Sequence, residues 1–163
     1  MSSNELFKNL FRNATEGESK APIMGHLPDY VQGRIIYNGP VGKWDFEKES
    51  ARHWFDGQSI LTGFQIDRKE QVVKVSKKFL QSTALQKAES HGKVIITEYG
   101  TAGSKDPDKN IISRTISSIV PGEMTDNCAC NIFDLGGVTV AATETALLRY
   151  GLPKSKSAPF VSL

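Results

Sequence analysis

The chain has 163 residues, of which 39% are hydrophobic and 23% are charged. This length and composition are typical of one globular domain and exclude an intrinsically disordered chain. Its 20 basic and 18 acidic residues give a net charge of +2, which is too small to indicate a nucleic-acid-binding protein. The sequence shows no secretory signal and no apolar run of about 18 residues, so we expect it neither to be secreted nor to cross a membrane.

Residues 1–20 are predicted to form a short amphipathic helix followed by a linker. Ser2 and Glu5 have the spacing of a capping box, in which each side chain bonds to the backbone amide of the other residue. Four apolar residues share one helical face: Leu6, Phe7, Leu10 and Phe11. We expect this face to pack against the chain's own domain, with contact to a membrane surface as the alternative.

Beyond residue 20 the apolar residues recur with a period near two, which indicates β-strands. The β-branched run from Gly33 to Tyr37 is followed by Asn38-Gly39-Pro40, which predicts a turn that ends the strand. Ile60 to Ile66 and Val73 to Phe79 flank a polar connection, and their alternation predicts a hairpin with one buried face. Four further strands are predicted, at Lys93–Glu98, Ile111–Val120, Ala129–Leu135 and Val138–Thr143, and the last two are joined across Gly136-Gly137 as a hairpin. With hardly any helix between the strands, the pattern favours an all-β sandwich, barrel or propeller.

The cysteines and histidines predict neither a disulfide framework nor a metal centre. Cys128 and Cys130 are one residue apart in an apolar stretch, and an extended backbone would place both free thiols on one buried face. His26, His53 and His91 match no local metal-ligand spacing, so each is predicted to be structural or exposed. Motifs for nucleophilic or phosphoryl-transfer chemistry are absent from the sequence.

Six short motifs stand out by their order and spacing. They are His53-Trp-Phe-Asp-Gly57, Lys78-Phe-Leu-Gln-Ser82, Ile96-Thr-Glu-Tyr-Gly-Thr101, Asp106-Pro-Asp-Lys-Asn110, Thr125-Asp-Asn127 and Ala142-Thr-Glu-Thr145. Together they closely resemble the N-terminal part of the carotenoid cleavage oxygenases, the family of the animal β-carotene oxygenases and of the retinoid isomerohydrolase of the retinal pigment epithelium. The resemblance covers residues 21–150 and leaves residues 151–163 as a flexible tail unrelated to the family.

The resemblance implies a seven-bladed β-propeller that holds an iron(II) ion on its axis through four histidines. Enzymes of this family cleave a carotenoid double bond oxidatively to apocarotenoids or retinal, and the isomerohydrolase branch acts on retinyl esters instead. Residues 21–150 correspond to one or two blades. We therefore expect an all-β fold that is an incomplete part of such a propeller, preceded by the short N-terminal helix.

The resemblance also implies roles for single residues. Glu144 matches the family carboxylate that accepts a hydrogen bond from an iron-ligating histidine, and Thr143 matches a residue that lines the iron cleft. Four other polar residues are expected to serve the structure: Glu98, Asp56, Asp126 and Asn127. The last three have short side chains that can bond backbone amides in turns and loops.

None of the three histidines matches an iron ligand of the family, whose ligands come from strands beyond Glu144. We therefore expect a truncated member of an iron(II)-dependent dioxygenase family, without a metal ligand or a cofactor-binding residue of its own. Such a chain would bind no iron alone and would be inactive alone.

The alternative is a non-catalytic module that binds apolar polyenes or retinoids, or that pairs with a full-length relative through open strand edges. The expected ligand is a carotenoid or retinoid lipid, and not a nucleic acid. We expect the chain in the cytoplasm, with peripheral membrane contact because the substrates are lipids. The basic early helix leaves a mitochondrial address as a further alternative.

Overall fold

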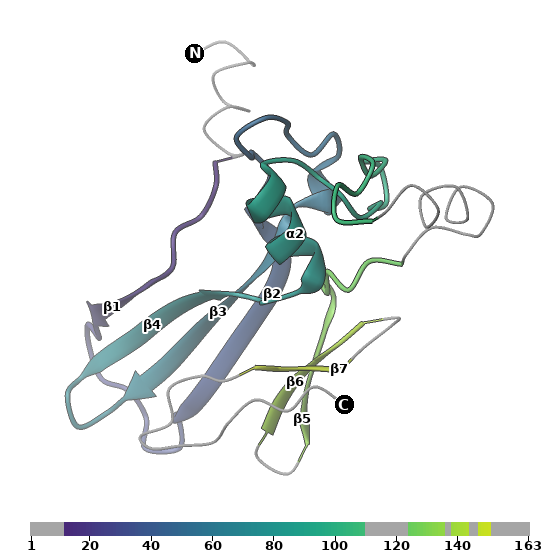
Figure 1. Ribbon diagram of the computed structural model, residues 1–163. Coiled ribbons are helices and arrows are strands. Elements are labelled where there is room, and N and C mark those ends of the chain that lie inside the picture. Colours follow the sequence, from purple (N-terminus) through teal and green to yellow (C-terminus); the bar gives the residue numbers. More distant parts are fainter. Residues whose placement is uncertain (1–11, 110–123, 136–137, 144–146, 151–163) are drawn as a thin grey trace.

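The computed structural model describes residues 12–109, 124–135, 138–143 and 147–150, which form two antiparallel sheets and two helical segments (Figure 1). The larger sheet has the strand order β1-β4-β3-β2, and the smaller sheet has the order β5-β6-β7. The strands are β1 (Gly17–Pro22), β2 (Gly33–Lys43), β3 (Gln58–Asp67), β4 (Val72–Phe79), β5 (Asn131–Leu135), β6 (Val138–Ala142) and β7 (Leu147–Tyr150). The 3-10 helix η1 spans Trp54–Asp56, and the α-helix α2 spans Thr83–His91 at one end of the larger sheet.

Strands β3 and β4 form the predicted hairpin. Ile60 lies opposite Phe79, and the Glu70 amide donates to the Asp67 carboxylate at 3.0 Å in the connection. The expectation of a single buried face is wrong at the start of β3, where Ile60 and Leu61 point to opposite faces and are 2% and 0% exposed. The first residues of this inner strand are therefore covered on both sides.

Strand β2 continues through the predicted turn. It runs beyond Tyr37 as far as Lys43, and its register with β3 shifts between Gly39 and Lys43. Pro40 has no amide hydrogen to donate, but β2 is an edge strand of the described sheet, where one missing donor is tolerated. The turn prediction is therefore wrong, and Asn38-Gly39-Pro40 forms an irregularity within the strand.

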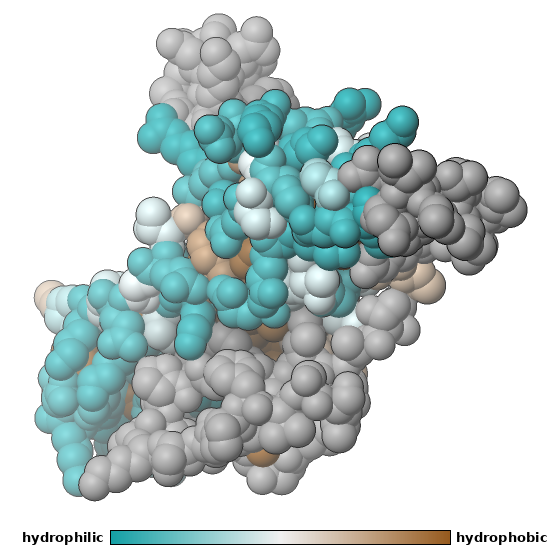
Figure 2. All heavy atoms as spheres, viewed as in Figure 1, coloured by the Kyte–Doolittle hydropathy of each residue, from teal (hydrophilic) through white to brown (hydrophobic). Residues whose placement is uncertain are grey.

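Apolar residues from both sheets meet in one core. The core contains Leu61, Leu80, Cys128 and Ala141, with Ile36 and Ile132 packed against them. Asn38 also donates from Nδ2 to the Cys128 carbonyl at 2.8 Å, so a side chain of β2 holds the segment that leads into β5. Figure 2 shows hydrophilic side chains over most of the coloured part of one face, with hydrophobic residues visible near its centre. The core and this hydrogen bond join the smaller sheet to the larger one.

The helix α2 occupies a segment where no helix was expected. Ser82 begins it, since its hydroxyl accepts the Leu85 amide at 3.1 Å, and Gly92 ends it in a left-handed conformation with φ of 69°. Ala84, Leu85 and Ala88 are buried against the rest of the chain. A serine cap and a glycine after the last turn are sequence signals for a helix, so this element could have been predicted.

Residues 93–98 are irregular, and the strand predicted there is wrong. The β-branched residues Val94, Ile95 and Ile96 are 2–7% exposed, so burial accounts for their apolar character. The Val94 carbonyl accepts a hydrogen bond from the Ser104 amide at 2.9 Å, which closes a loop instead of extending a sheet.

The N-terminal prediction is corrected in part. Gly17–Pro22 forms β1, which pairs antiparallel with β4, so the linker expected up to residue 20 is wrong for residues 17–20. The predicted helical face lies within residues 1–11, outside the described residues. The predicted strand Ile111–Val120 and the tail at 151–163 also lie outside them.

Strands β5 and β6 pair antiparallel, which confirms the hairpin predicted at this position. Cys128 is buried as expected, but Cys130 is exposed, and both thiols are free. The expectation for Cys130 is wrong because residues 128–130 precede β5 and are not extended strand. Within the described residues, no helix has the length and apolar character needed to span a bilayer.

Replacing Leu61 with alanine is expected to lower the free energy of unfolding by about 2–5 kcal/mol, because it leaves a cavity in the core shared by both sheets. Ile35→Ala is the matched control, since Ile35 is 55% exposed and its loss should cost less than about 1 kcal/mol. Urea unfolding followed by circular dichroism measures both variants. Equal losses would contradict a shared core at Leu61.

Candidate functional site

Three of the sequence motifs meet in a buried polar network at the start of β3. Asp56, the last residue of η1, is 1% exposed. Its carboxylate accepts hydrogen bonds from the Gly100 amide at 3.0 Å and from the Thr101 hydroxyl at 2.6 Å. The Thr101 hydroxyl oxygen in turn accepts the Arg52 amide at 2.7 Å. One carboxylate thus joins the segment before β3 to the loop after residue 98.

Glu98 lies inside this network and is 8% exposed. Its Oε1 accepts hydrogen bonds from Gln58 Nε2 at 3.2 Å and from the Thr125 hydroxyl at 3.0 Å. Burial raises the pKa of Glu98 to about 7, and the nearby Asp56 carboxylate raises it too, whereas the bonds from Thr125 and Gln58 lower it. The carboxyl group is therefore partly protonated at neutral pH, enclosed by protein partners.

Asn127 ties the network to β3. Its Oδ1 accepts the Ser59 amide at 2.9 Å, and its Nδ2 donates to the Gly57 carbonyl at 3.1 Å. The Asn127 amide itself donates to the Thr125 hydroxyl oxygen at 3.0 Å. The side chain therefore pairs with backbone groups as a neighbouring strand would, at the point where β3 begins.

Asp126 caps α2 from a distant part of the sequence. It accepts the amides of Thr83 and Ala84 at 2.6 and 2.9 Å, and Thr83 is 43 positions away along the chain. A negative charge at a helix N-terminus also interacts favourably with the helix dipole. These bonds agree with the scaffolding roles expected for Asp56, Asp126 and Asn127, although most of their partners are distant in sequence.

Thr143 and Glu144, the residues expected at an iron cleft, follow strand β6. Ala141 is 0% exposed in the shared core, and the Cys128 thiol donates to the Ala142 carbonyl at 2.8 Å. The strand that precedes the pair is therefore fixed against the rest of the structure. Thr143 is half-buried at the end of this strand, whereas Glu144 lies outside the described residues.

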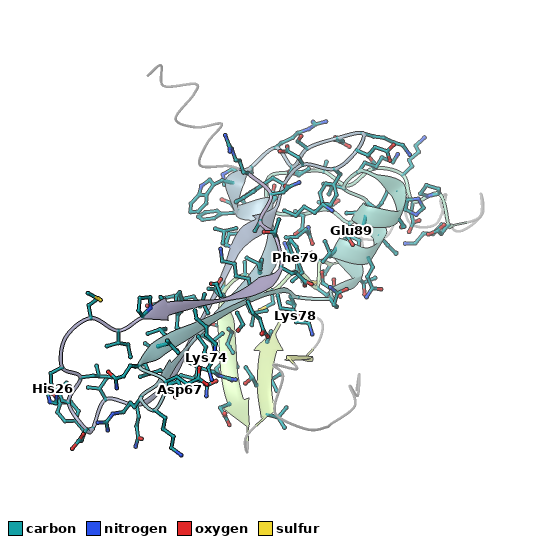
Figure 3. All side chains as sticks on the ribbon, turned by 90° about the vertical axis from the view of Figure 1, so that its left-hand side faces the viewer. His26, Asp67, Lys74, Lys78, Phe79 and Glu89 are labelled. Atoms are coloured by element: carbon teal, nitrogen blue, oxygen red, sulfur yellow. The ribbon has the colours of Figure 1, made fainter. Side chains whose placement is uncertain are left out.

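The three histidines do not come together. His26 lies at the end of the larger sheet that is remote from Glu89 in α2 (Figure 3), whereas His91 is the last residue of α2. Among the described residues, no cluster of candidate metal ligands contains more than one histidine. The described residues therefore do not fit a four-histidine iron centre.

Four rings in and next to η1 form a partly exposed group, which we call the aromatic cluster: His53, Trp54, Phe55 and Tyr99. The Trp54 and Phe55 ring centroids are 4.0 Å apart, and His53 lies 5.3 Å from Tyr99. Trp54, Phe55 and Tyr99 are 50%, 49% and 83% exposed. The cluster thus presents apolar surface to solvent next to the buried network.

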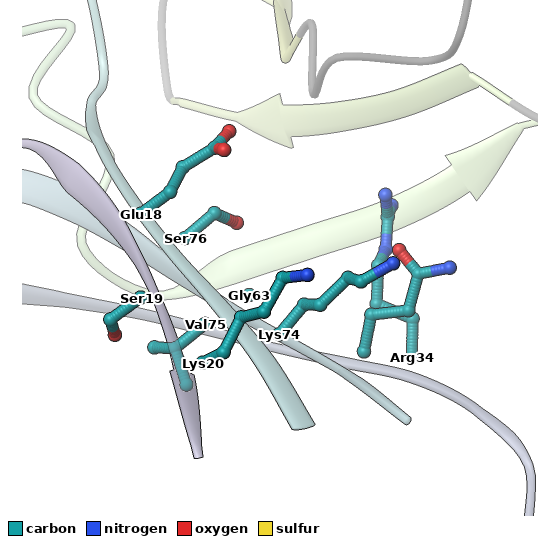
Figure 4. A pocket seen from close by; sticks show the side chains of 9 residues that line it. Glu18, Ser19, Lys20, Arg34, Gly63, Lys74, Val75 and Ser76 are labelled. Atoms are coloured by element: carbon teal, nitrogen blue, oxygen red, sulfur yellow. The ribbon is translucent and has the colours of Figure 1, made fainter. Parts of the chain in front are cut away.

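A cavity of about 380 Å³ lies over the larger sheet, and most of the residues that line it are polar (Figure 4). Lys20 of β1 is paired with Lys74 of β4. The Glu70 carboxylate lies 2.6 Å from the ammonium group of Lys20 and 3.2 Å from that of Lys74. Hydrogen bonds from Lys20 and then Lys74 hold the pKa of Glu70 below its ordinary value. A lining with these charges does not suit an apolar polyene.

Comparison with known proteins gives consistent matches. A family model described as "Retinal pigment epithelial membrane protein" matches residues 10–150. The chain is 34% identical over 125 residues to the mitochondrial carotenoid-cleaving dioxygenase of Mustela putorius furo, and 35% identical over 129 residues to that of Homo sapiens. Each alignment covers 77% of this chain but only 23% and 22% of the relatives. The chain spans less than a quarter of the length of these proteins.

Solved structures show the same fold at lower identity. An ACO/RPE65 chimera superposes with a TM-score of 0.69 at 18% identity, over 99% of this chain and 31% of that chain. A mutant of Synechocystis apocarotenoid oxygenase superposes with a TM-score of 0.64 at 20% identity, over 94% of this chain and 32% of that chain. These matches confirm the predicted all-β fold as an incomplete part of a propeller.

Replacing Glu98 with glutamine is expected to remove a pH dependence of stability. The carboxyl pKa is raised from 4.5 to about 7 in the folded state, so its stabilising contribution is complete below pH 4.5 and is lost as the pH rises through 7. At about 1.4 kcal/mol per pKa unit, the free energy of unfolding of the native chain should fall by about 3 kcal/mol over this pH range. Glu98→Gln should not show this fall. Urea unfolding between pH 4.5 and 8 measures the difference.

Glu18→Gln is the matched control, because Glu18 is an exposed glutamate of β1. This variant should keep the pH dependence of the native chain. A Glu98→Gln profile parallel to that of the native chain would contradict a raised pKa at Glu98.

Proposed function

The chain belongs to the carotenoid oxygenase family, and on this basis we propose that it forms part of the scaffold of an iron(II)-dependent carotenoid-cleaving dioxygenase. The reaction proposed for the complete enzyme is oxidative cleavage of a carotenoid double bond to apocarotenoids or retinal. The observation that carries this proposal is the family match over residues 10–150. The ligand class proposed with it is a carotenoid or retinoid lipid.

The proposed contribution of this chain is to position the segment of Thr143 and Glu144. Ala141 and Cys128 anchor β6 to the shared core immediately before these residues, which supports the proposal. In the complete enzyme, Glu144 would accept the outer N–H of a ligating imidazole and so fix the orientation of the ring. Thr143 would lie beside it at the iron cleft.

We further propose that this chain alone does not hold the catalytic iron. The sequence contains three histidines, fewer than the four of the centre implied by the family resemblance. His26 and His91 lie at different ends of the described structure, and His53 belongs to the aromatic cluster. The chain's own residues therefore support a role in binding and positioning, and no step of iron chemistry is assigned to them.

The cellular location is proposed to be the cytoplasm, with peripheral membrane contact through the lipid substrate. The curated relatives carry the word mitochondrial in their names, which describes those proteins. A mitochondrial location is therefore the alternative for this chain.

A second candidate function is polyene binding without catalysis, which the aromatic cluster favours. Trp54, Phe55 and Tyr99 expose apolar ring surface on one side of the molecule, and flat conjugated ligands stack on such rings. In contrast, several charged side chains line the cavity over the larger sheet. The two functions differ in whether iron is required.

Iron loading tests the first proposal. The purified full chain, incubated with ferrous iron without oxygen and then desalted, is expected to release no cleavage product from β-carotene on exposure to oxygen, and to retain no iron beyond the amount that is lost in His91→Ala. Metal analysis and chromatography of the products provide the readouts. His91→Ala is measured in parallel, so that any iron bound near His91 is recognised. A full equivalent of iron with product formation would contradict the proposal.

Fluorescence tests the second candidate. If the aromatic cluster binds polyenes, retinol added to the metal-free chain should quench tryptophan fluorescence, and Tyr99→Ala should weaken this binding by roughly fivefold, or about 1 kcal/mol. Tyr30→Ala is the matched control, because Tyr30 and Tyr99 are both 83% exposed and Tyr30 lies outside the cluster. Equal binding by the two variants would exclude the cluster as the site.

A further inference from the structure

A cluster of candidate metal ligands lies between the end of α2 and the loop that follows it. We call it the His91 cluster, and it consists of His91, Asp106 and Asp108. One ligand atom from each residue lies within 4.8 Å of the other two. The His91 Nε2 atom is 3.0 Å from Asp108 Oδ2, so the imidazole and this carboxylate already face each other.

The backbone fixes the positions of all three side chains. Gly92 adopts a left-handed conformation with φ of 69°, so the chain leaves α2 directly after His91 and the imidazole stands at the helix end. The Asp108 amide donates to Asp106 Oδ1 at 3.0 Å, which places both carboxylates on one short turn. The fold therefore assembles the cluster without a metal ion.

One imidazole and two carboxylates form a ligand set suited to a divalent transition-metal ion. Zinc binds imidazole nitrogen and carboxylate oxygen at about 2.0–2.2 Å, so its ligand atoms lie about 3–4 Å from one another. A contraction of about 1 Å from the largest separation in the cluster would meet this geometry. The Asp108 side chain is 67% exposed, so water can complete the coordination. The imidazole favours zinc over magnesium, which prefers oxygen ligands.

Lys87 competes with a metal ion for this cluster. Its Nζ atom lies 3.0 Å from Asp106 Oδ2. Burial raises the pKa of Asp106, but hydrogen bonds from Lys87 and the Asp108 amide outweigh it and hold the pKa below its ordinary value. The carboxylate is therefore charged at neutral pH, and a metal ion would have to share or displace the ammonium group. This competition lowers the affinity of the cluster for a metal ion, so removal of the Lys87 ammonium group should raise that affinity.

We propose that the His91 cluster binds a divalent transition-metal ion, represented by zinc, through His91 Nε2 and one oxygen each from Asp106 and Asp108. The ion would replace the contact between His91 Nε2 and Asp108 Oδ2. It would bind the Nε2 lone pair of the neutral ring, in the tautomer that carries its one ring hydrogen on Nδ1. The bound ion links the C-terminal end of α2 to the loop.

Calorimetric titration of the metal-free full chain with zinc tests this site. One equivalent of zinc is expected to bind, and His91→Ala and Asp108→Asn should each weaken binding roughly tenfold or more. Lys87→Met should strengthen binding, because it removes the competing ammonium group while keeping an unbranched side chain of similar length. His26→Ala is the matched control, since His26 is exposed at the remote end of the sheet (Figure 3).

The exposed thiol of Cys130 is a second place where zinc could bind, so the titrations are repeated with Cys130→Ser. Zinc binding that persists in Cys130→Ser, is lost in His91→Ala and is stronger in Lys87→Met supports the proposal. Failure of the native chain to bind zinc, or equal binding by the native chain and His91→Ala, would overturn it. Neither result depends on cleavage of a carotenoid, so the site is tested independently of the proposed enzyme function.

Discussion

Three short polar side chains accept hydrogen bonds from backbone amides and so hold the irregular half of this structure in place. A buried amide without a partner costs about 1–3 kcal/mol, and a loop has no neighbouring strand to supply one. Asp56 supplies an acceptor to Gly100, Asn127 to Ser59, and Asp126 to the first turn of α2. The placement of α2, of the loop after residue 98 and of the segment leading to β5 all depends on these bonds.

Local patterns predicted the hairpins well and the irregular segments poorly. The β3–β4 hairpin follows from alternation and a polar connection, both of which are properties of adjacent residues. Val94, Ile95 and Ile96 are β-branched and buried, and burial alone does not distinguish a strand from a packed loop. Pro40 was expected to end β2, but its effect depends on whether a neighbour needs its donor, which only the sheet order decides.

The site shows the same limit of sequence reasoning. The scaffolding roles of Asp126 and Asn127 follow from side-chain chemistry, but their partners lie 43 and 68 positions away and only the fold identifies them. The raised pKa of Glu98 arises mainly from burial, which its motif does not reveal. Similarly, His91 and Asp108 are 17 positions apart in the sequence. The end of a helix and a loop bring them together, so no short spacing of metal ligands in the sequence indicates the contact. The family resemblance located Glu144 without requiring any of these contacts.

Strand β1 is held against β4 without a buried apolar face. All six of its residues are exposed, so no apolar face fixes its register against β4. The alignment depends on backbone pairing, on the ion pair between Lys20 and Glu70, and on the Glu16 carboxylate that accepts the Phe79 amide at 2.7 Å. Exposed ion pairs weaken as ionic strength rises. In concentrated salt this strand should fray before the others, and the uncovered edge of β4 would then be free to recruit a strand from another molecule.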